Sequence, residues 1–152
     1  MRVTVVAVGR AKRGPTETLW QDYARRLTWP VTLKEIDLRG GAEGPTRQRR
    51  EAAQLLAAVP RGARLVALDE RGEDLASATL AALLSDWRDR GIADLAFVIG
   101  GADGLDPTVR AAADLVLAFG RQTWPHMMAR AMLIEQIYRA QQIILGHPYH
   151  RA

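Results

Sequence analysis

Short apolar runs alternate with longer amphipathic segments along this chain, and this alternation constrains the fold more than any other feature. The apolar runs have the length and the β-branched content of strands. They occupy residues 3–8, 31–38, 64–70, 95–101 and 115–119. The amphipathic segments have helical periodicity. They occupy residues 16–28, 46–58, 75–90, 105–113 and about 125–145. Several of the strands are apolar on both faces, so this order predicts an α/β domain with helices on both faces of a mainly parallel sheet.

Cap and turn residues indicate where several elements begin and end. We expect Pro125 in the first turn of the last helix and Gly146 as its stop. Asp103 or Asp106 is expected to cap the fourth helix. The glycine-rich segment 40–45 is predicted to be a mobile loop.

Length and composition bound the class of protein. With 152 residues the chain has the size of one ordinary domain, and we expect a single domain spanning residues 1–152. The N-terminus does not resemble a signal peptide, and no stretch approaches the ~20 apolar residues of a membrane span. Cysteine is absent, which excludes disulfides, thiol nucleophiles and thiolate metal sites. These features favour a soluble, cytoplasmic protein that acts away from membranes.

The basic charge gathers in the C-terminal third. The formal net charge is +4, and residues 107–152 carry five arginines against two acidic residues. Only Lys12 and Lys34 are lysines among the 21 basic residues. Arginine makes forked contacts with phosphates and stacks on bases, so this bias permits an anionic partner. An Ala-rich and Arg-rich composition also follows from a GC-rich genome, and charge alone leaves both interpretations open.

Three glycine-containing turns follow predicted strands immediately. They are LDERG at 68–72, IGGADG at 99–104 and FGRQTWPH at 119–126. In open α/β sheets ligands bind beyond the carboxyl ends of the strands. These turns are therefore the first place to expect a binding site.

Two of these turns also have a purely structural interpretation. The glycines of 99–104 let the backbone approach a ligand, but their GGxxG spacing matches neither a P-loop nor a dinucleotide fingerprint. They equally suit a tight connection from strand to helix. In 119–126, free N–H groups at a helix start favour an adenine or a carboxylate. Alternatively, Thr123 is simply the N-cap of that helix and Trp124 an anchor to the core.

The last thirty residues concentrate ionisable and aromatic side chains. All three histidines and two of the three tyrosines lie there. His126 and Arg130 fall one turn apart on one helix face, and Glu135 and Arg139 have the spacing of an ion pair. The tail histidines are too few for a metal site, so no metal is expected. No nucleophile elbow, P-loop or HExxH motif occurs, and chemistry by Arg, His, Tyr and backbone groups favours a pre-activated cofactor.

Six segments, in order, resemble one known family. They are VAVGR, LDERG, FVIGGADGLDP, TWPHMMAR, IEQIYRA and HPYHR. Each is unspecific by itself, but together, over nearly the whole chain, they resemble the RlmH family of SPOUT-class methyltransferases. The resemblance implies a SPOUT fold with a C-terminal trefoil knot, a homodimer, and S-adenosylmethionine-dependent methylation of N3 of a pseudouridine in 23S ribosomal RNA. A small chain of modest charge binds naked RNA weakly, so we expect the substrate to be the assembled ribosome.

The resemblance also implies where S-adenosyl-L-methionine binds. It assigns the cofactor to the three turns described above, at Leu68, Gly100, Phe119, Gly120, Arg121, Gln122, Thr123 and Trp124. Arg121 and Gln122 are long side chains where small or apolar ones would also serve. The role of these two side chains stays open.

Candidate catalytic roles follow from the chemistry of an imide nitrogen, which must lose its proton before it accepts a methyl group. The resulting anion spreads onto the flanking carbonyl oxygens. Arg139 or Arg130 is the candidate to stabilise that anion, and His126 or His150 is the candidate to accept the proton. Tyr138 completes the candidate catalytic set.

The closing residues His147, Tyr149 and Arg151 are candidates for contact with the RNA, with Tyr149 stacking on or hydrogen-bonding an extruded base. Because chain ends fray unless something holds them, we expect this tail to be ordered only when a partner subunit or the substrate meets it.

Two other classes of function compete with methylation. A non-catalytic ribosome-associated binding protein would retain the SPOUT fold but would need neither Arg139 nor the tail. A nucleotide-dependent oxidoreductase on an ordinary doubly wound sheet is disfavoured, because the glycine-rich turn follows the fourth predicted strand and not the first.

Overall fold

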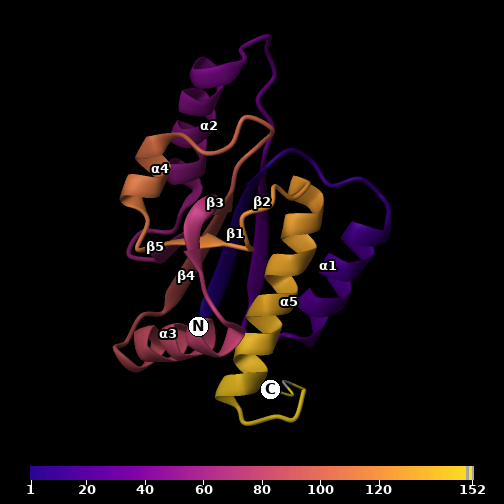
Figure 1. Ribbon diagram of the computed structural model, residues 1–152, viewed down its shortest axis with the longest axis vertical. Helices are drawn as coiled ribbons and strands as arrows, with labels where there is room; N and C mark the ends of the chain where they lie inside the picture. Colours follow the sequence, from indigo (N-terminus) through magenta and orange to yellow (C-terminus); the bar gives the residue numbers. More distant parts are fainter. Residues whose placement is uncertain (150, 152) are drawn as a thin grey trace.

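The computed structural model describes residues 1–149 and residue 151, and a five-stranded sheet lies at its centre (Figure 1). The strands are β1 (Arg2–Val8), β2 (Val31–Ile36), β3 (Arg64–Asp74), β4 (Asp94–Ile99) and β5 (Leu115–Ala118). Their order in the sheet is β2-β1-β4-β3-β5, and each neighbouring pair is parallel. The predicted strands and their parallel arrangement are confirmed.

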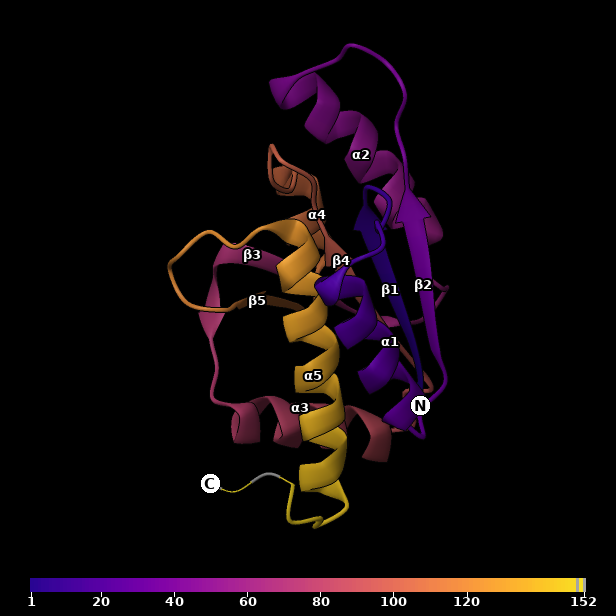
Figure 2. The same ribbon diagram turned by 90° about the vertical axis from the view of Figure 1, so that its right-hand side faces the viewer.

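Among the described residues, five helices cover the two faces of this sheet. They are α1 (Pro15–Arg26), α2 (Gly44–Ala58), α3 (Ser77–Asp89), α4 (Pro107–Ala112) and α5 (His126–Ile144). Helices α1, α3 and α5 pack on one face, whereas α2 and α4 pack on the other (Figure 2). The predicted helices on both faces are therefore confirmed.

Two separate apolar clusters fill the layers between the sheet and its helices, because successive side chains along a strand point to opposite faces. Val5 belongs to the cluster that includes Leu84 of α3 and Leu133 of α5. Its neighbour Val6 belongs to the cluster that includes Leu55 of α2. With both faces covered, the loops at the strand ends are left to form a binding site.

Strand β3 contains a bulge that the sequence pattern did not predict. It pairs with β5 at Leu68 and again at Glu73, and the residues between these two leave the ladder. At Gly72 a Cβ atom would lie 2.5 Å from the carbonyl oxygen of Val116. The LDERG segment is therefore a bulge within a strand, and the prediction that it follows the strand was wrong. The strand continues past the bulge, so α3 begins at Ser77.

Helix α5 runs from the carboxyl edge of the sheet toward its opposite edge (Figure 2). Gly146, with φ of 69°, ends the helix as predicted. Pro125 is the N-cap residue and lies one position before the predicted first turn, and its carbonyl accepts from Ala129 N at 2.9 Å. The chain tail therefore lies at the end of α5 remote from segment 119–126.

The starts of two further helices correct or settle the predicted boundaries. Helix α2 begins at Gly44, so the last two residues of the predicted loop 40–45 belong to it, because Pro45 suits a first helical turn. Asp106 caps α4, and its Oδ2 accepts from Thr108 N at 3.0 Å. Within the described residues, no helix has the length and apolar character needed to cross a bilayer.

Candidate functional site

The three glycine-containing turns converge on one cavity of about 570 Å³ at the carboxyl edge of the sheet. Its lining consists of residues 68–71, 99–105, 117, 119, 120, 122–126 and 129. Seven of the eight residues predicted to bind the cofactor therefore share one cavity. Arg121 is exposed and lies outside this lining. The sequence located the cavity, and the role of its residues as cofactor ligands stays a prediction.

The second turn fits both interpretations of its glycines, as a tight connection after a strand and as backbone that borders a binding site. Gly101 and Gly104 form an isolated antiparallel bridge, with Gly104 N donating to Gly101 O at 3.0 Å. A Cβ atom on Gly100 would lie 3.0 Å from the backbone carbon of Gly104. The turn is thus tight enough to require glycine, and its backbone also borders the cavity.

The third turn is fixed by two side-chain hydrogen bonds. Thr123 Oγ1 donates to Glu70 Oε2 of the first turn at 2.6 Å. Trp124 Nε1 donates to Phe119 O at 2.8 Å. The interpretation of Thr123 as the N-cap was wrong, since Pro125 occupies that position. The Thr123 hydroxyl instead connects two of the turns that border the cavity.

Helix α5 places His126 and Arg130 in different environments, although they are one turn apart. His126 is partly buried and lines the cavity. The Arg130 side chain is only 4% exposed, and its guanidinium donates to Glu35 Oε2 at 2.7 Å. It also donates to two carbonyl oxygens at the end of β1, the nearer at 2.7 Å. Arg130 therefore fixes the end of β1 and is not accessible to a substrate in this chain.

The pKa of Glu35 reflects this contact with Arg130. Burial alone would raise the pKa of the carboxyl group, but hydrogen bonds from the Arg130 guanidinium and from the Ala11 N–H outweigh burial and lower it. The interaction is consequently strongest when Glu35 is ionised.

A second cluster of candidate residues lies toward the C-terminal end of α5. Arg139 donates two bonds to Glu135 Oε1, at 2.6 and 3.0 Å, which confirms the predicted pair and raises the pKa of Arg139. Tyr149 donates to the same oxygen at 3.0 Å. Its ring meets that of Tyr138 edge-on, with 4.8 Å between ring centroids. Burial, together with bonds to Tyr23 and Glu135, raises the pKa of Tyr149.

The tail residue Tyr149 thus has partners within its own chain. We expected the tail to be ordered only when a partner subunit or the substrate meets it, and that expectation did not include these contacts. The reason is the aromatic surface of Tyr138, which lies beside Tyr23 at 5.7 Å between ring centroids. Arg139 also lies 5.0 Å from the centroid of the Tyr149 ring. His147 and Arg151 are exposed nearby in the sequence.

The cavity and this second cluster are far apart in one chain. Along α5 the rise from His126 to Arg139 is about 20 Å. The structure therefore brings the three turns together with His126 but leaves Arg139 at a distance. His150, the other predicted proton acceptor, lies outside the described residues.

Sequence reasoning missed several polar residues around the cavity. The carboxyl groups of Asp69, Glu70 and Asp103 belong to lining residues, and Arg110 of α4 contacts the first turn from behind. The sequence did contain a signal for these residues, because Asp69 and Glu70 are adjacent acidic residues that closely follow a buried segment of β3. Among the residues that the structure describes, no group of three or more potential ligands is placed to hold a metal ion.

Comparison with known proteins connects this arrangement to a family. A family model described as "Predicted SPOUT methyltransferase" matches residues 1–150. The ribosomal RNA large subunit methyltransferase H of Rhodospirillum centenum is 61% identical over 152 residues, covering 100% of both chains. The protein of the same name from Paramagnetospirillum magneticum is 54% identical over 151 residues, covering 99% of each chain.

Among solved structures, the SpoU methyltransferase AviRb from Streptomyces viridochromogenes, crystallised with AdoMet, superimposes with a TM-score of 0.48 at 14% identity. The match covers 93% of this chain and 58% of that one. The family match over nearly the full length, together with relatives of more than half identity, is decisive. The chain therefore belongs to the RlmH family of SPOUT methyltransferases.

Proposed function

We propose that this chain transfers a methyl group from S-adenosyl-L-methionine to N3 of a pseudouridine in 23S ribosomal RNA, acting on the assembled ribosome. The observation that carries the proposal is the convergence of turns associated with β3, β4 and β5 on one cavity at the carboxyl edge of the sheet. Membership of the family, and relatives named as ribosomal RNA large subunit methyltransferases, support the reaction and the class of substrate.

The cavity fits a cofactor of this size and polarity. Its volume of about 570 Å³ lies within the range of small-molecule sites. Gly100 borders the cavity and carries no side chain, so its backbone polar groups can approach a ligand closely. Leu68 and Phe119 supply apolar surface for a base, whereas Glu70 and Asp103 supply carboxylates that suit a positively charged cofactor.

When bound, the cofactor supplies a methyl group on a sulfonium, which is already a good leaving group. The chain's own residues then have to orient the two reactants and manage one proton. His126 lines the cavity at the first residue of α5, and its imidazole is assigned to accept the N3 proton. His150 stays the alternative acceptor.

Arg139 is assigned to stabilise the negative charge that spreads onto the carbonyl oxygens beside N3. Its side chain is 29% exposed, so it can contact a substrate while retaining Glu135 as a partner. Arg130 is assigned a positioning role, because it holds the end of β1 next to His126. Tyr138 is assigned to support the ring of Tyr149.

This assignment requires two copies of the chain, because Arg139 is about 20 Å along α5 from His126 of the same copy. A second cavity, of about 510 Å³, is lined by the exposed apolar side chains Leu19 of α1 and Met128 of α5. Exposed apolar side chains that line one cavity suit a contact with another protein surface. Phe119 lines both cavities, so a homodimer formed on this surface would bring the partner's α5 close to the cofactor.

The tail residues His147, Tyr149 and Arg151 are assigned to the RNA. Arg139 lies 5.0 Å from the centroid of the Tyr149 ring, so an RNA anion that draws Arg139 away uncovers this ring for stacking on a base. The resemblance to the family further implies a cytoplasmic location with the ribosomes, and a trefoil knot in the C-terminal part of the chain.

Transfer of a labelled methyl group tests the proposal. We expect 23S RNA to be labelled in ribosomes taken from cells that lack the gene, and to be labelled far less as naked RNA. Binding of S-adenosylmethionine with no label in either substrate would favour a different RNA. Absence of both cofactor binding and label would favour the non-catalytic ribosome-associated protein.

Mixed dimers test the composite site separately. One variant carries Arg139→Met. The other carries Gly100→Val, whose side chain has no room beside Gly104 and Leu105 and would therefore distort the turn that borders the cavity. Each is expected to be inactive alone. After exchange of subunits in equal amounts, half of the dimers are mixed and each has one intact composite site, so activity should return to about one quarter of the original. No recovery in verified mixed dimers would contradict the composite arrangement.

A further inference from the structure

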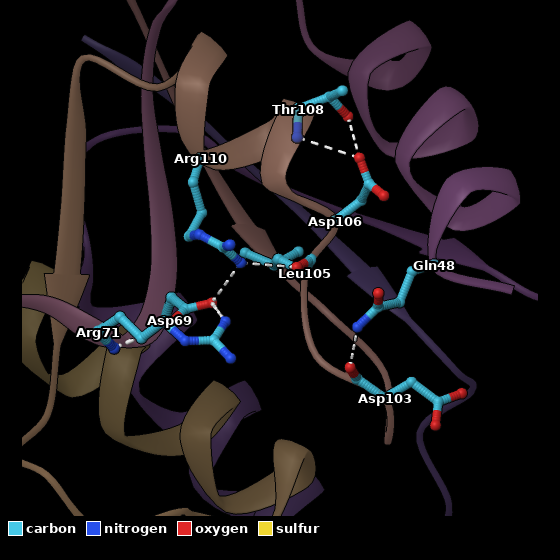
Figure 3. A network of polar contacts seen from close by, with 8 residues as sticks. All are labelled: Gln48, Asp69, Arg71, Asp103, Leu105, Asp106, Thr108 and Arg110. Atoms are coloured by element: carbon cyan, nitrogen blue, oxygen red, sulfur yellow. Dashed lines mark hydrogen bonds and ion pairs between the residues drawn. The ribbon is translucent and has the colours of Figure 1, made fainter. Parts of the chain in front are cut away.

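Two adjacent acidic residues on the first turn each contact a different neighbouring turn. Asp69 is connected to the second turn through Arg110 of α4 (Figure 3). Glu70 accepts the hydrogen bond from Thr123 of the third turn at 2.6 Å. The first turn is therefore connected directly to the third turn and, through Arg110, to the residue that follows the second turn.

The connection through Arg110 is the more buried of the two. Arg110 Nη1 lies 2.7 Å from the carbonyl oxygen of Leu105, the residue directly after the second turn, and 3.4 Å from Asp69 Oδ2. The side chain of Asp69 is only 6% exposed and that of Arg110 is 23% exposed. A single guanidinium nitrogen thus bridges the two turns where solvent competes weakly.

Asp69 also shapes its own turn. Its Oδ1 accepts from Arg71 N at 2.9 Å, so both carboxylate oxygens have partners. The Arg71 guanidinium lies 3.9 Å from Oδ2, but its side chain is 67% exposed, which makes this contact weak. The bulge of β3 is therefore closed by the same carboxylate that contacts α4.

The second turn and the helix that follows it are fixed by two further contacts. Gln48 of α2 donates to the carbonyl oxygen of Asp103 (Figure 3). Asp106 caps α4, and Val109 of that helix is fully buried. These two contacts fix the position of the Arg110 backbone. Arg110 itself lies outside the cavity lining.

We propose that Asp69 and Arg110 are a positioning pair that sets the separation of the first and second turns, and thereby the affinity for the cofactor. This inference rests on the proposed function for the identity of the ligand. The pair acts through Leu105 and the bulge, whose backbones border the cavity.

Calorimetric titration of the full chain with S-adenosylmethionine tests the pair. We expect Arg110→Ala and Asp69→Asn each to weaken binding about tenfold, as loss of one charge-assisted hydrogen bond would do. The double variant should bind no more weakly than the weaker single variant, because both remove the same connection. Arg110→Lys should recover part of the affinity, since one ammonium can still reach one of the two acceptors.

Arg64→Ala is the matched control. Arg64 pairs with Asp114 at 2.8 Å and also connects β3 with the segment before β5, but it lies outside the cavity lining. Its loss should leave the affinity unchanged while lowering stability to a similar small extent. Equal affinity of Arg110→Ala and Arg64→Ala variants for the cofactor would overturn the proposal.

Amide hydrogen exchange in the cofactor-free chain separates this proposal from the proposed function. Arg71 N is protected by Asp69 Oδ1, so its exchange should accelerate in Asp69→Ala, which removes the acceptor, and, through loss of the bridge, in Arg110→Ala. Unchanged exchange at Arg71 in Arg110→Ala would contradict the pair even if the original chain binds the cofactor. If Arg71 N exchanges faster in Arg110→Ala but the original chain does not bind S-adenosylmethionine, the positioning pair is supported and only the assignment of the cofactor is contradicted.

Discussion

Replacing each of two arginines on α5 by methionine should separate a structural role from a catalytic one. Methionine keeps an apolar stem of similar length but removes the charge. Arg130 is 4% exposed and donates to Glu35 and to two carbonyl oxygens. Its loss removes a donor from three acceptors, although Glu35 keeps the Ala11 N–H and, at 30% exposed, regains water. We expect a cost of about 3 kcal/mol for Arg130→Met.

Arg139→Met should cost far less. Its pair with Glu135 joins residues four apart on a partly exposed helix face, and such pairs contribute about 0.3–0.5 kcal/mol. The contact with the Tyr149 ring adds roughly 0.5 kcal/mol. The total is about 1 kcal/mol.

Urea and thermal denaturation measure these differences. For a chain of this size, 1 kcal/mol corresponds to about 2–4 °C in Tm, so Arg130→Met should lower Tm by about 10 °C and Arg139→Met by about 3 °C. At a temperature well below the Tm of both variants, Arg139→Met should lose methyltransferase activity, whereas Arg130→Met should retain most of it. Equal Tm values, or loss of methylation only in Arg130→Met, would refute the division of roles.

Three further changes have defined outcomes. Gly72→Ala should destabilise the chain by about 2 kcal/mol in urea denaturation, because the new Cβ would lie 2.5 Å from the Val116 carbonyl oxygen; unchanged stability would contradict the bulge geometry. Glu35 has a folded-state pKa below its ordinary 4.5, so its stabilisation is present at neutral pH and is lost as the pH falls through the folded pKa. Replacing Glu35 by Gln should flatten this acid limb of the stability profile, and an unaltered limb would count against it. Tyr149→Phe removes the hydroxyl bonds to Glu135 and Tyr23 but keeps the ring, so limited proteolysis should cut the tail faster; equal cleavage rates would argue that these bonds do not hold the tail.

Local patterns were sufficient to predict the sheet and its helices. Runs such as 3–8 and 95–101 are apolar on both faces because both faces of the sheet are covered by helices. The rule that ligands bind at strand ends correctly grouped the turns after β4 and β5 with the bulged segment of β3, although that segment lies within its strand. It did so because all five strands are parallel, which places their carboxyl ends at one edge.

The details of the site depend on contacts between residues distant in sequence, which a local pattern does not contain. Nothing near Thr123 indicates that its hydroxyl reaches Glu70, 53 positions away. Arg130 and Arg139 looked equivalent on the helix, and only Glu35, 95 positions from Arg130, distinguishes a buried guanidinium from an accessible one. The trefoil knot stays a prediction from family resemblance, since threading depends on the path of the whole chain.

The central claim is that this chain places a methyl group on N3 of a pseudouridine in 23S ribosomal RNA. Mass spectrometry of 23S RNA fragments from cells with and without the gene tests it most directly. We predict one pseudouridine-containing fragment that is heavier by one methyl group only when the gene is present, and not when the gene encodes Arg139→Met. Identical fragment masses in cells with and without the gene would contradict the claim.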